Sequence, residues 1–372
     1  MPRADAARRG RELRQRLRTG WSDGGDPLDV LHRTATELLR HVPADIWCAV
    51  LLDPSTLLDT GGQHAHGFPE AVMPRLFQIE HIDQDGVDAL RRLVRQAAPA
   101  RLLSLSTGGD PAACRYYREI LRPLDLADEL RVLIRDEQRV WGLLVLCRHR
   151  ASAPFTADDL AVAGRGIGPA VTALRRSLLV TGAECDGAPD APAVLTLGPD
   201  ERVSAATDAA KSWLDLIPEA GRAGRDTLPY PVHAVVARAR ASAGGHAVAR
   251  LRGRNGQWLA VHAMPMTHPG GTTTTVSIGP VEPGELCAIV LNAYGLTPRE
   301  HDIAQLVLLG RSTAHIQQAL HITEDTVQDH LKSVFRKTGV HSRRELVGVV
   351  FTRHYLPSLN RAPLTTDGRL IG

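Results

Sequence analysis

The spacing of apolar and polar residues is clearest in residues 296–352, where it predicts a series of short helices. Thr297 and Glu300 form a capping box, with Pro298 at the first helical position between them. Apolar residues then recur at helical spacing until Gly310, a residue type that commonly follows the last turn of a helix. The pattern predicts an amphipathic helix with one buried face.

Two further helices are predicted directly after the first. One begins at Ser312 or Thr313, and a turn at His321 and Ile322 separates it from a helix that Thr323 caps. The apolar face of this last helix comprises Val327, Leu331, Val334 and Phe335. Its opposite face comprises Asp325, Gln328, Asp329, Lys332 and Arg336. Such a pair of helices, the second with a polar and partly basic outer face, is typical of a helix-turn-helix that enters the major groove of DNA.

Residues 26–180 mix the periodicities of helices and strands, which predicts an α/β unit. Helical patterns cover 27–41, 69–78, 85–97 and 111–122, and strands are predicted at 47–52 and 101–105. Strands at 130–134 and 140–146 flank a short turn and predict an antiparallel hairpin. The segment Phe155-Thr156-Ala157-Asp158-Asp159 then caps a long helix that runs through Leu179.

The closing helix of this unit has an apolar stripe that suits two roles. The stripe comprises Leu160, Ile167, Val171, Leu174 and Leu178. It fits a contact between two copies of the chain, and it fits packing on the unit's own sheet equally well. Gly164, Gly166, Gly168 and Pro169 predict a weakened, kinked helix.

Residues 193–281 predict a smaller α+β unit. Strands are expected at 193–197, from 203, and at 248–252, 258–264 and 272–278, with helices at 207–216 and 233–241. Asn255 and Gly256 provide a strong hairpin turn between two of these strands. A final helix over 284–294 leads into the helix-turn-helix.

The patterns together predict a multidomain protein: an α/β unit, a small α+β unit and an all-α unit of four helices. The expected divisions are 1–25, a basic flexible arm; 26–180; 181–192, a linker; 193–281; 282–295, a linker helix; 296–356; and 357–372, a tail. The arginine-rich arm suits either contact with nucleic acid or a solvated, disordered tail.

Composition places the chain among cytoplasmic globular proteins. A net charge of +3 is too small to indicate nucleic-acid binding, but charge is unevenly distributed. From Leu331 to His354 there is one acid, Glu345, against the bases Lys332, Arg336, Lys337, Arg343, Arg344 and Arg353. The 5 cysteines are isolated, which fits reduced thiols. No apolar run approaches the ~18 residues of a membrane span, so no membrane partner is expected.

The C-terminal segment resembles the DNA-binding domain of LuxR-type (NarL/FixJ-type) bacterial transcription regulators. The residues that carry the resemblance are Leu296-Thr297-Pro298-Arg299-Glu300, Gly310, Ser312, Ile316, Thr326-Val327, His330, Gly339-Val340 and Ser342-Arg343. The chain departs from the family at Ala314-His315, Gln317 and the Gln328-Asp329 pair. The resemblance therefore implies the fold and DNA binding, but no target sequence.

Two weaker resemblances cover the upstream units. Residues 139–146 and 154–160 are similar to the late hairpin and closing helix of GAF domains, which hold a small molecule or serve only for dimerisation. Residues 194–203 and 206–214 resemble the start of a PAS domain. No cofactor is evident, and the resemblances imply a small-molecule ligand as one role of the GAF-like or PAS-like unit.

These observations lead to a hypothesis of a sequence-specific transcription regulator that binds double-stranded DNA as a homodimer. Base edges are expected to be contacted by Gln328, Asp329 and Lys332. Phosphates are expected to be contacted by Thr313, Thr326, Arg336, Lys337 and Arg343. The alternative is a protein-interaction scaffold whose C-terminal helices contact RNA polymerase or another protein without reading DNA.

Other chemistry finds little support in the sequence. His64, His66 and the more distant His81 offer metal ligands, but no third ligand follows at motif spacing, which favours surface histidines and no metal. No phosphate-binding loop is present, and no nucleophile and base are paired, so an enzyme is not expected. Cys48, Cys114 and Cys147 lie in apolar surroundings, typical of inert thiols rather than redox sensors.

Overall fold

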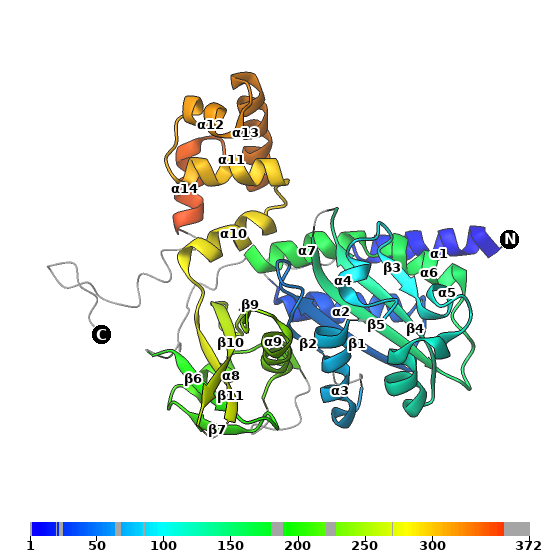
Figure 1. Ribbon diagram of the computed structural model, residues 1–372. Helices are drawn as coiled ribbons and strands as arrows, with labels where there is room; N and C mark the ends of the chain where they lie inside the picture. Colours follow the sequence, from blue (N-terminus) through cyan, green and yellow to red (C-terminus); the bar gives the residue numbers. More distant parts are fainter. Residues whose placement is uncertain are drawn as a thin grey trace.

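The computed structural model describes residues 2–19, 21, 25–63, 68–84, 86–137, 139–179, 189, 191–220, 228–269 and 271–352. Two sheet-containing units lie side by side, and a helical unit lies beyond them (Figure 1). The tail at 357–372 and most of the linker at 181–192 fall outside the described residues.

In the first sheet, β3, β4, β5, β1 and β2 lie side by side in that order, and each of these neighbouring pairs is antiparallel. Its strands are β1 (Ile46–Leu52), β2 (Asp59–Gln63), β3 (Ala100–Leu102), β4 (Leu126–Arg135) and β5 (Val140–His149). Strands β4 and β5 form the predicted hairpin. The strand predicted at 101–105 was wrong beyond Leu102, because helix α5 begins at Leu103.

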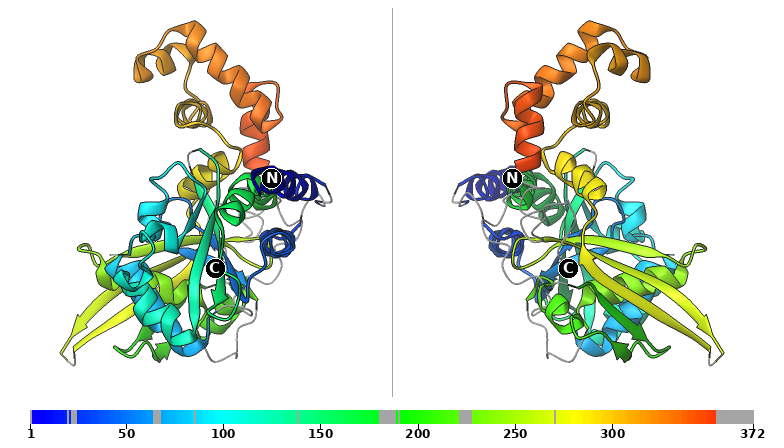
Figure 2. Two further views of the ribbon diagram at one scale, coloured as in Figure 1. Left: turned by 90° about the vertical axis from the view of Figure 1, so that its right-hand side faces the viewer. Right: turned by 90° about the vertical axis from the view of Figure 1, so that its left-hand side faces the viewer.

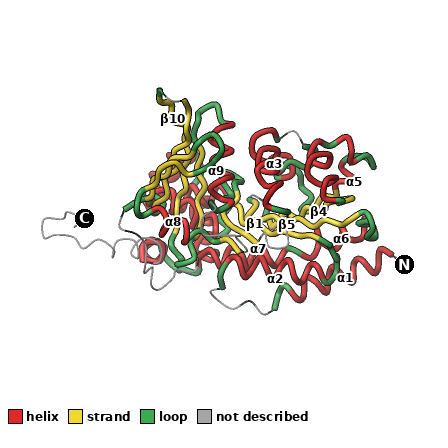
Figure 3. The backbone as a smooth tube through the Cα atoms, turned by 90° about the horizontal axis from the view of Figure 1, so that it is seen from below, coloured by secondary structure: helices red, strands yellow, loops and turns green. Residues whose placement is uncertain are grey.

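Helices cover both faces of this sheet (Figure 3). One face carries α1 (Pro2–Arg16), α2 (Pro27–Leu39), α6 (Ala157–Gly166) and α7 (Gly168–Leu179). The other carries the short helices η1 (Glu70–Val72), α3 (Met73–Phe77), η2 (Gln78–Asp83), α4 (Leu90–Leu93), α5 (Leu103–Ser106), η3 (Pro111–Ala113), η4 (Tyr117–Leu121) and η5 (Arg122–Leu124). The buried strands therefore separate two apolar cores.

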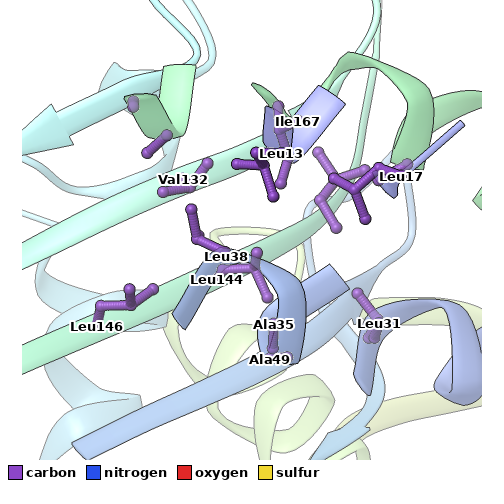
Figure 4. Close-up of a cluster of buried hydrophobic side chains, with 14 of the residues drawn as sticks. Leu13, Leu17, Leu31, Ala35, Leu38, Ala49, Val132, Leu144, Leu146 and Ile167 are labelled. Atoms are coloured by element: carbon purple, nitrogen blue, oxygen red, sulfur yellow. The ribbon is translucent and has the colours of Figure 1, made fainter. Parts of the chain in front are cut away.

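The prediction of a flexible basic arm at residues 1–25 was wrong for residues 2–16. Helix α1 packs against α6, and its Leu13 side chain is completely buried beside Ile167 (Figure 4). Ala6, Gly10 and Leu17 lie on the same buried face of the helix. Burial of this apolar stripe stabilises the helix, while Arg8, Arg11 and Arg14 are exposed on its outer side.

The closing helix of the first unit is broken, as its glycines and proline predict. Helix α6 ends at Gly166 and α7 begins at Gly168, with Ile167 between them. Ile167, Val171 and Leu174 are buried against the unit's own sheet and α2. The apolar stripe is therefore buried within one chain. The alternative interpretation, a contact between two copies of the chain, is wrong for these residues.

The central sheet repeats the connectivity of the first, with the order β7-β6-β11-β10-β9 and antiparallel neighbours. Its strands are β6 (Ala193–Leu197), β7 (Val203–Ala206), β9 (Ala247–Arg252), β10 (Trp258–His268) and β11 (Gly271–Pro280). Helices α8 (Ala210–Asp215) and α9 (Tyr230–Ala241) precede β9. In both sheets the first strand of the unit lies between the second and the fifth.

The two sheet units share a buried boundary. The short strand β8 (Glu219–Ala220) pairs in parallel with β2 of the first sheet. Met73 and Phe77 of α3 belong to the same apolar cluster as the core of the central unit. At another point of this boundary, the Asp53 carboxylate, only 1% exposed, accepts hydrogen bonds from the Arg250 backbone at 2.9 Å and its guanidinium at 3.3 Å.

Helix α10 (Pro283–Ala293) leads from the central sheet to the C-terminal unit, which lies beyond it (Figure 2). This unit contains α11 (Pro298–Leu308), α12 (Thr313–Leu320), α13 (Glu324–Thr338) and α14 (Arg343–Val350) around its own apolar core. Helix α10 also packs on α7, where the Arg175 side chain donates to the Ala293 carbonyl at 3.0 Å. No helix within the described ranges has the length and hydrophobicity to cross a membrane.

Candidate nucleic-acid interface

Helix α13 has one buried and one exposed face, as its sequence predicts. Val327, Leu331 and Val334 are almost completely buried, and Phe335 packs against the same core. The opposite face is exposed at Asp325, Gln328, Asp329, Lys332 and Arg336. The helix therefore offers a continuous polar surface to a partner.

Both ends of α13 are fixed by local contacts. The Thr323 hydroxyl accepts a hydrogen bond from the Thr326 backbone N–H at 3.3 Å and lies 2.8 Å from the Thr326 hydroxyl. Glu324 lies in the first turn and Arg336 in the last, where each charge is favourable to the helix dipole. Gly339 ends the helix with a φ of 72°, a left-handed conformation that glycine adopts without steric cost.

The turn before α13 is tied to the neighbouring helices. His321 adopts a left-handed φ of 51° after α12, and the Arg299 guanidinium donates to the Leu320 carbonyl at 2.6 Å. Ile316 is the buried residue of α12, whereas Ala319 is exposed. These contacts set the orientation of α12 against α13.

The three predicted base-contacting residues lie together on the exposed face of α13. Gln328 is exposed, and its side chain makes no hydrogen bond within the part of the chain that the structure describes. The Lys332 ammonium lies 3.1 Å from the Asp329 carboxylate, and both side chains are about three-quarters exposed, at 77% and 76%. Ion pairs this exposed contribute little stability, so their charged groups are available to a ligand.

Of the predicted phosphate-contacting residues, Thr313 and Arg343 are brought together from different helices. The Arg343 guanidinium donates to the Thr313 hydroxyl at 2.8 Å and to the Arg311 carbonyl at 3.1 Å. Arg336 is exposed and donates to the Ser333 hydroxyl at 3.2 Å. Sequence reasoning missed Arg311, whose position directly before the Ser312 cap of α12 was the available signal.

Lys337, a residue that we predict to contact phosphate, forms an ion pair with Glu300 in the protein itself. Its ammonium lies 2.5 Å from the Glu300 carboxylate, which is buried and also accepts hydrogen bonds from the Thr297 backbone and the Ser333 hydroxyl, each at 2.7 Å. Burial opposes ionisation of Glu300, but these donors outweigh it and lower its pKa. Lys337 therefore joins α13 to α11.

A second candidate site is a cavity in the first unit, between its sheet and the helices α3, η2 and α4. Its volume is about 80 Å³. Aliphatic residues such as Val50, Leu143 and Val145 line the sheet side, and Met73 and Phe77 line the helical side. We call this space the sheet cavity.

The other candidate residues do not form sites in the described structure. His64 and His66 lie outside the described residues, and His81 is buried. Cys48, Cys114 and Cys147 are buried, as their apolar surroundings predict. Burial raises the pKa of Cys48 to about 12 and also raises the pKa of Cys147, which keeps both thiols protonated.

Comparison with known proteins assigns two of the three units. Residues 295–350 match the luxR family of bacterial regulatory proteins, and residues 26–189 match the GAF domain. The chain carries a LuxR-type helix-turn-helix domain and a GAF domain. Neither match extends over the central sheet.

Individual relatives are similar over limited regions. The transcriptional regulatory protein MctR of Rhizobium johnstonii is 40% identical over 52 residues, 14% of this chain and 24% of MctR. The chain thus spans about a quarter of that relative's length.

Solved structures overlap only loosely with the whole chain. The Vibrio cholerae VqmA dimer without target DNA is 17% identical, covering 47% of this chain and 90% of that one, with a TM-score of 0.20. A V. cholerae VqmA–ligand–DNA complex is 17% identical, covering 50% of this chain and 92% of the VqmA chain, with a TM-score of 0.23. The bacteriophytochrome RpBphP3 of R. palustris is 13% identical, covering 74% of this chain and 62% of the phytochrome chain, with a TM-score of 0.29. These scores carry no argument about function.

Proposed function

We propose that this protein is a sequence-specific DNA-binding transcription regulator. The observation that carries the proposal is the exposed polar face of α13 within a domain that matches the luxR family. In this role α13 enters the major groove, while α11 and α12 support it from behind. The role is one of binding and regulation, without catalysis.

Base reading is assigned to Gln328, Asp329 and Lys332. An amide pairs with adenine, a carboxylate accepts from cytosine N4, and an ammonium donates to guanine. Their exposure on one face of α13 supports this assignment. The contact between Asp329 and Lys332 is weak enough to be exchanged for contacts with bases.

Phosphate binding is assigned to Thr313, Thr326, Arg336 and Arg343, and we add Arg311. Thr313 and Arg311 flank the N-cap of α12, where backbone N–H groups and the helix dipole favour an anion. The hydrogen bonds from Arg343 to both residues support a shared phosphate contact. Such contacts fix the register of α13 without reading sequence.

The upstream units are proposed to sense a small molecule or to hold two copies of the chain together. The shared strand order of the two sheets supports a PAS-like central domain, related in architecture to the GAF domain. A dimer is expected because one short recognition helix discriminates poorly, whereas two helices read two half-sites. We place this activity in the cytoplasm, with RNA polymerase as a further partner.

Selection from a random pool of duplex DNA by the full-length protein tests the proposal. Recovery of a defined motif with two related half-sites is the expected result, and its binding should weaken steeply with salt because phosphate contacts release counterions. Failure to retain any duplex at low salt, together with binding to RNA polymerase, would instead support the interaction scaffold.

A further inference from the structure

The sheet cavity is apolar over most of its surface and large enough for more than water. Its volume of about 80 Å³ is several times the roughly 10–15 Å³ that one water requires. Leu52, Leu76 and Leu90 extend the lining that Phe77 and Val145 provide. Such a surface favours a ligand with a mainly hydrocarbon or aromatic body.

The only arginine that lines this cavity is already neutralised by the protein. The Arg131 guanidinium donates to Glu129 at 2.5 Å, to Glu80 at 2.6 Å and to the Asp88 carbonyl at 2.9 Å. Glu129 is further held by the Tyr116 hydroxyl at 2.6 Å. No unpaired positive charge therefore lines the cavity within the described residues, and an anionic ligand would face the acidic side chains of Glu80 and Asp59.

His81 differs from these paired groups. It lines the same cavity and is only 7% exposed, yet its imidazole makes no hydrogen bond to any residue that the structure describes. Its ring stacks on Phe77, with centroids 5.5 Å apart. Burial lowers the pKa of His81 to about 4, so the imidazole is neutral and offers one donor and one acceptor. A ligand in the cavity that donates to or accepts from this imidazole would supply the partner that the described side chains do not.

We propose that the sheet cavity binds an uncharged, mainly apolar small molecule that forms a hydrogen bond with His81. Simple phenols and alcohols of similar size represent this class. The inference rests on the proposed function in taking the GAF domain as a sensor, and it names the chemistry of the ligand. Charged molecules are disfavoured for three reasons. Glu80 is already paired with Arg131. Burial raises the pKa of Asp59, the other acidic residue that lines the cavity, and so opposes the charged form that a cation would need. An anion finds no guanidinium beyond the one that Glu80 and Glu129 neutralise.

The wall of the cavity is also part of the boundary with the central unit. Phe77, which stacks on His81, contacts Tyr230 and His233 of α9, with ring centroids 5.8 Å and 6.3 Å apart. His233 in turn lies 2.6 Å from Glu201. A ligand that fixes His81 therefore also orders side chains at the boundary between the two units.

Binding of a matched series of probes to the full-length protein tests this proposal. Phenol, toluene, benzoate and benzylamine share one ring and differ in hydrogen bonding and charge. Calorimetric titration near pH 7.5 should find phenol binding about 2- to 10-fold more tightly than toluene, the range expected for one hydrogen bond. Benzoate and benzylamine should bind at least 10-fold more weakly than phenol. Equal or tighter binding of either charged probe would overturn the proposal, as would a folded protein that binds no probe.

Two variants separate the role of His81 from general effects on folding. H81L replaces the imidazole with an apolar side chain that cannot form a hydrogen bond, so phenol and toluene should bind to it equally tightly. H301L is the matched control, because His301 has a buried ring nitrogen without a partner among the described residues and lies in the DNA-binding domain, away from the cavity; it should keep the preference for phenol. A preference that survives in H81L contradicts the assignment. DNA selection is measured separately. A protein that binds DNA but no probe would therefore contradict the proposed ligand and leave the proposed DNA binding intact.

Discussion

The Glu300 carboxylate joins α11 to α13 through contacts with Thr297, Ser333 and Lys337. Replacing it in E300Q removes the charge that holds Lys337, and we expect the DNA-binding domain to lose about 2 kcal/mol of stability. Because the pKa of Glu300 is lowered in the folded state, the stabilisation is fully present above the unfolded pKa, ~4.3. It is lost as the pH falls through the lower folded value.

Chemical denaturation of the wild type and E300Q between pH 3 and 7 checks this prediction. The difference in unfolding free energy should be constant near neutrality and should shrink in acid. A difference that stays the same at pH 3 would mean that the carboxylate charge contributes nothing.

His81 predicts a second pH dependence of stability, which arises from a buried neutral imidazole and not from a paired carboxylate. Its ordinary pKa of 6.5 falls to about 4 mainly because of burial, with Glu80 raising it and Arg238 and Arg91 lowering it further. The unfolded chain therefore binds an extra proton between these values, and stability falls by about 3 kcal/mol as the pH drops from 6.5 to 4. In H81L this loss should disappear, and the variant should be more stable than the wild type at pH 7. Urea denaturation at pH 5 and 7 measures both effects; an H81L variant with unchanged pH dependence contradicts the buried neutral imidazole.

For single residues, the sequence predicted which side chains are exposed better than it predicted which side chains form ion pairs. The helical period places Gln328 and Lys332 on the outer face of α13, and this needs only local spacing. The pairing of Lys337 with Glu300 depends on how α11 crosses α13, which no local pattern specifies. The same holds for Arg131, whose carboxylate partner Glu80 is remote in the sequence.

Two glycines, one at the end of α13 and one inside α14, offer a matched test of the glycine cap that ends α13. Gly339 has a φ of 72° and Gly348 lies within α14, and an added Cβ meets nothing within 4 Å at either position. We expect G339A to destabilise the domain by about 1 kcal/mol because alanine resists the left-handed conformation. G348A should stabilise it by roughly 0.5–1 kcal/mol because alanine favours helix. Thermal unfolding compares the pair, and equal effects would contradict the assigned cap.

Among the elements, those with strong local signals were predicted and those defined by tertiary packing were not. The Asn255-Gly256 turn and the capping boxes of α6 and α11 specify their hairpin and helices directly. Helix α1 was missed because its few apolar residues are spaced among arginines, and their burial requires α6 as a partner. Helix α5 follows β3 without any turn signal, so the strand was predicted too long.

For the whole molecule, the buried contact between Asp53 and Arg250 predicts that the GAF domain and central unit unfold together. D53N should weaken this boundary by about 1–3 kcal/mol, since it removes the buried one of the two carboxylates that pair with Arg250, the other being the more exposed Glu285. D200N is the control, because Asp200 pairs with Arg202 at the surface, where both are more than half exposed. Differential scanning calorimetry should find a lower or divided transition for D53N and no change for D200N. An unchanged D53N transition would mean that the boundary contributes nothing to stability.

The central claim is that the outer face of α13 reads a DNA duplex. Titration of the wild type, Q328A and R336A of the full-length protein against the selected motif and its single-base variants tests it most directly. Q328A should lose about 1–3 kcal/mol at one base pair and relax the preference there, whereas R336A should weaken all sequences alike and reduce the salt slope by about one. A uniform loss across sequences in Q328A, or no effect of either substitution, would contradict the account.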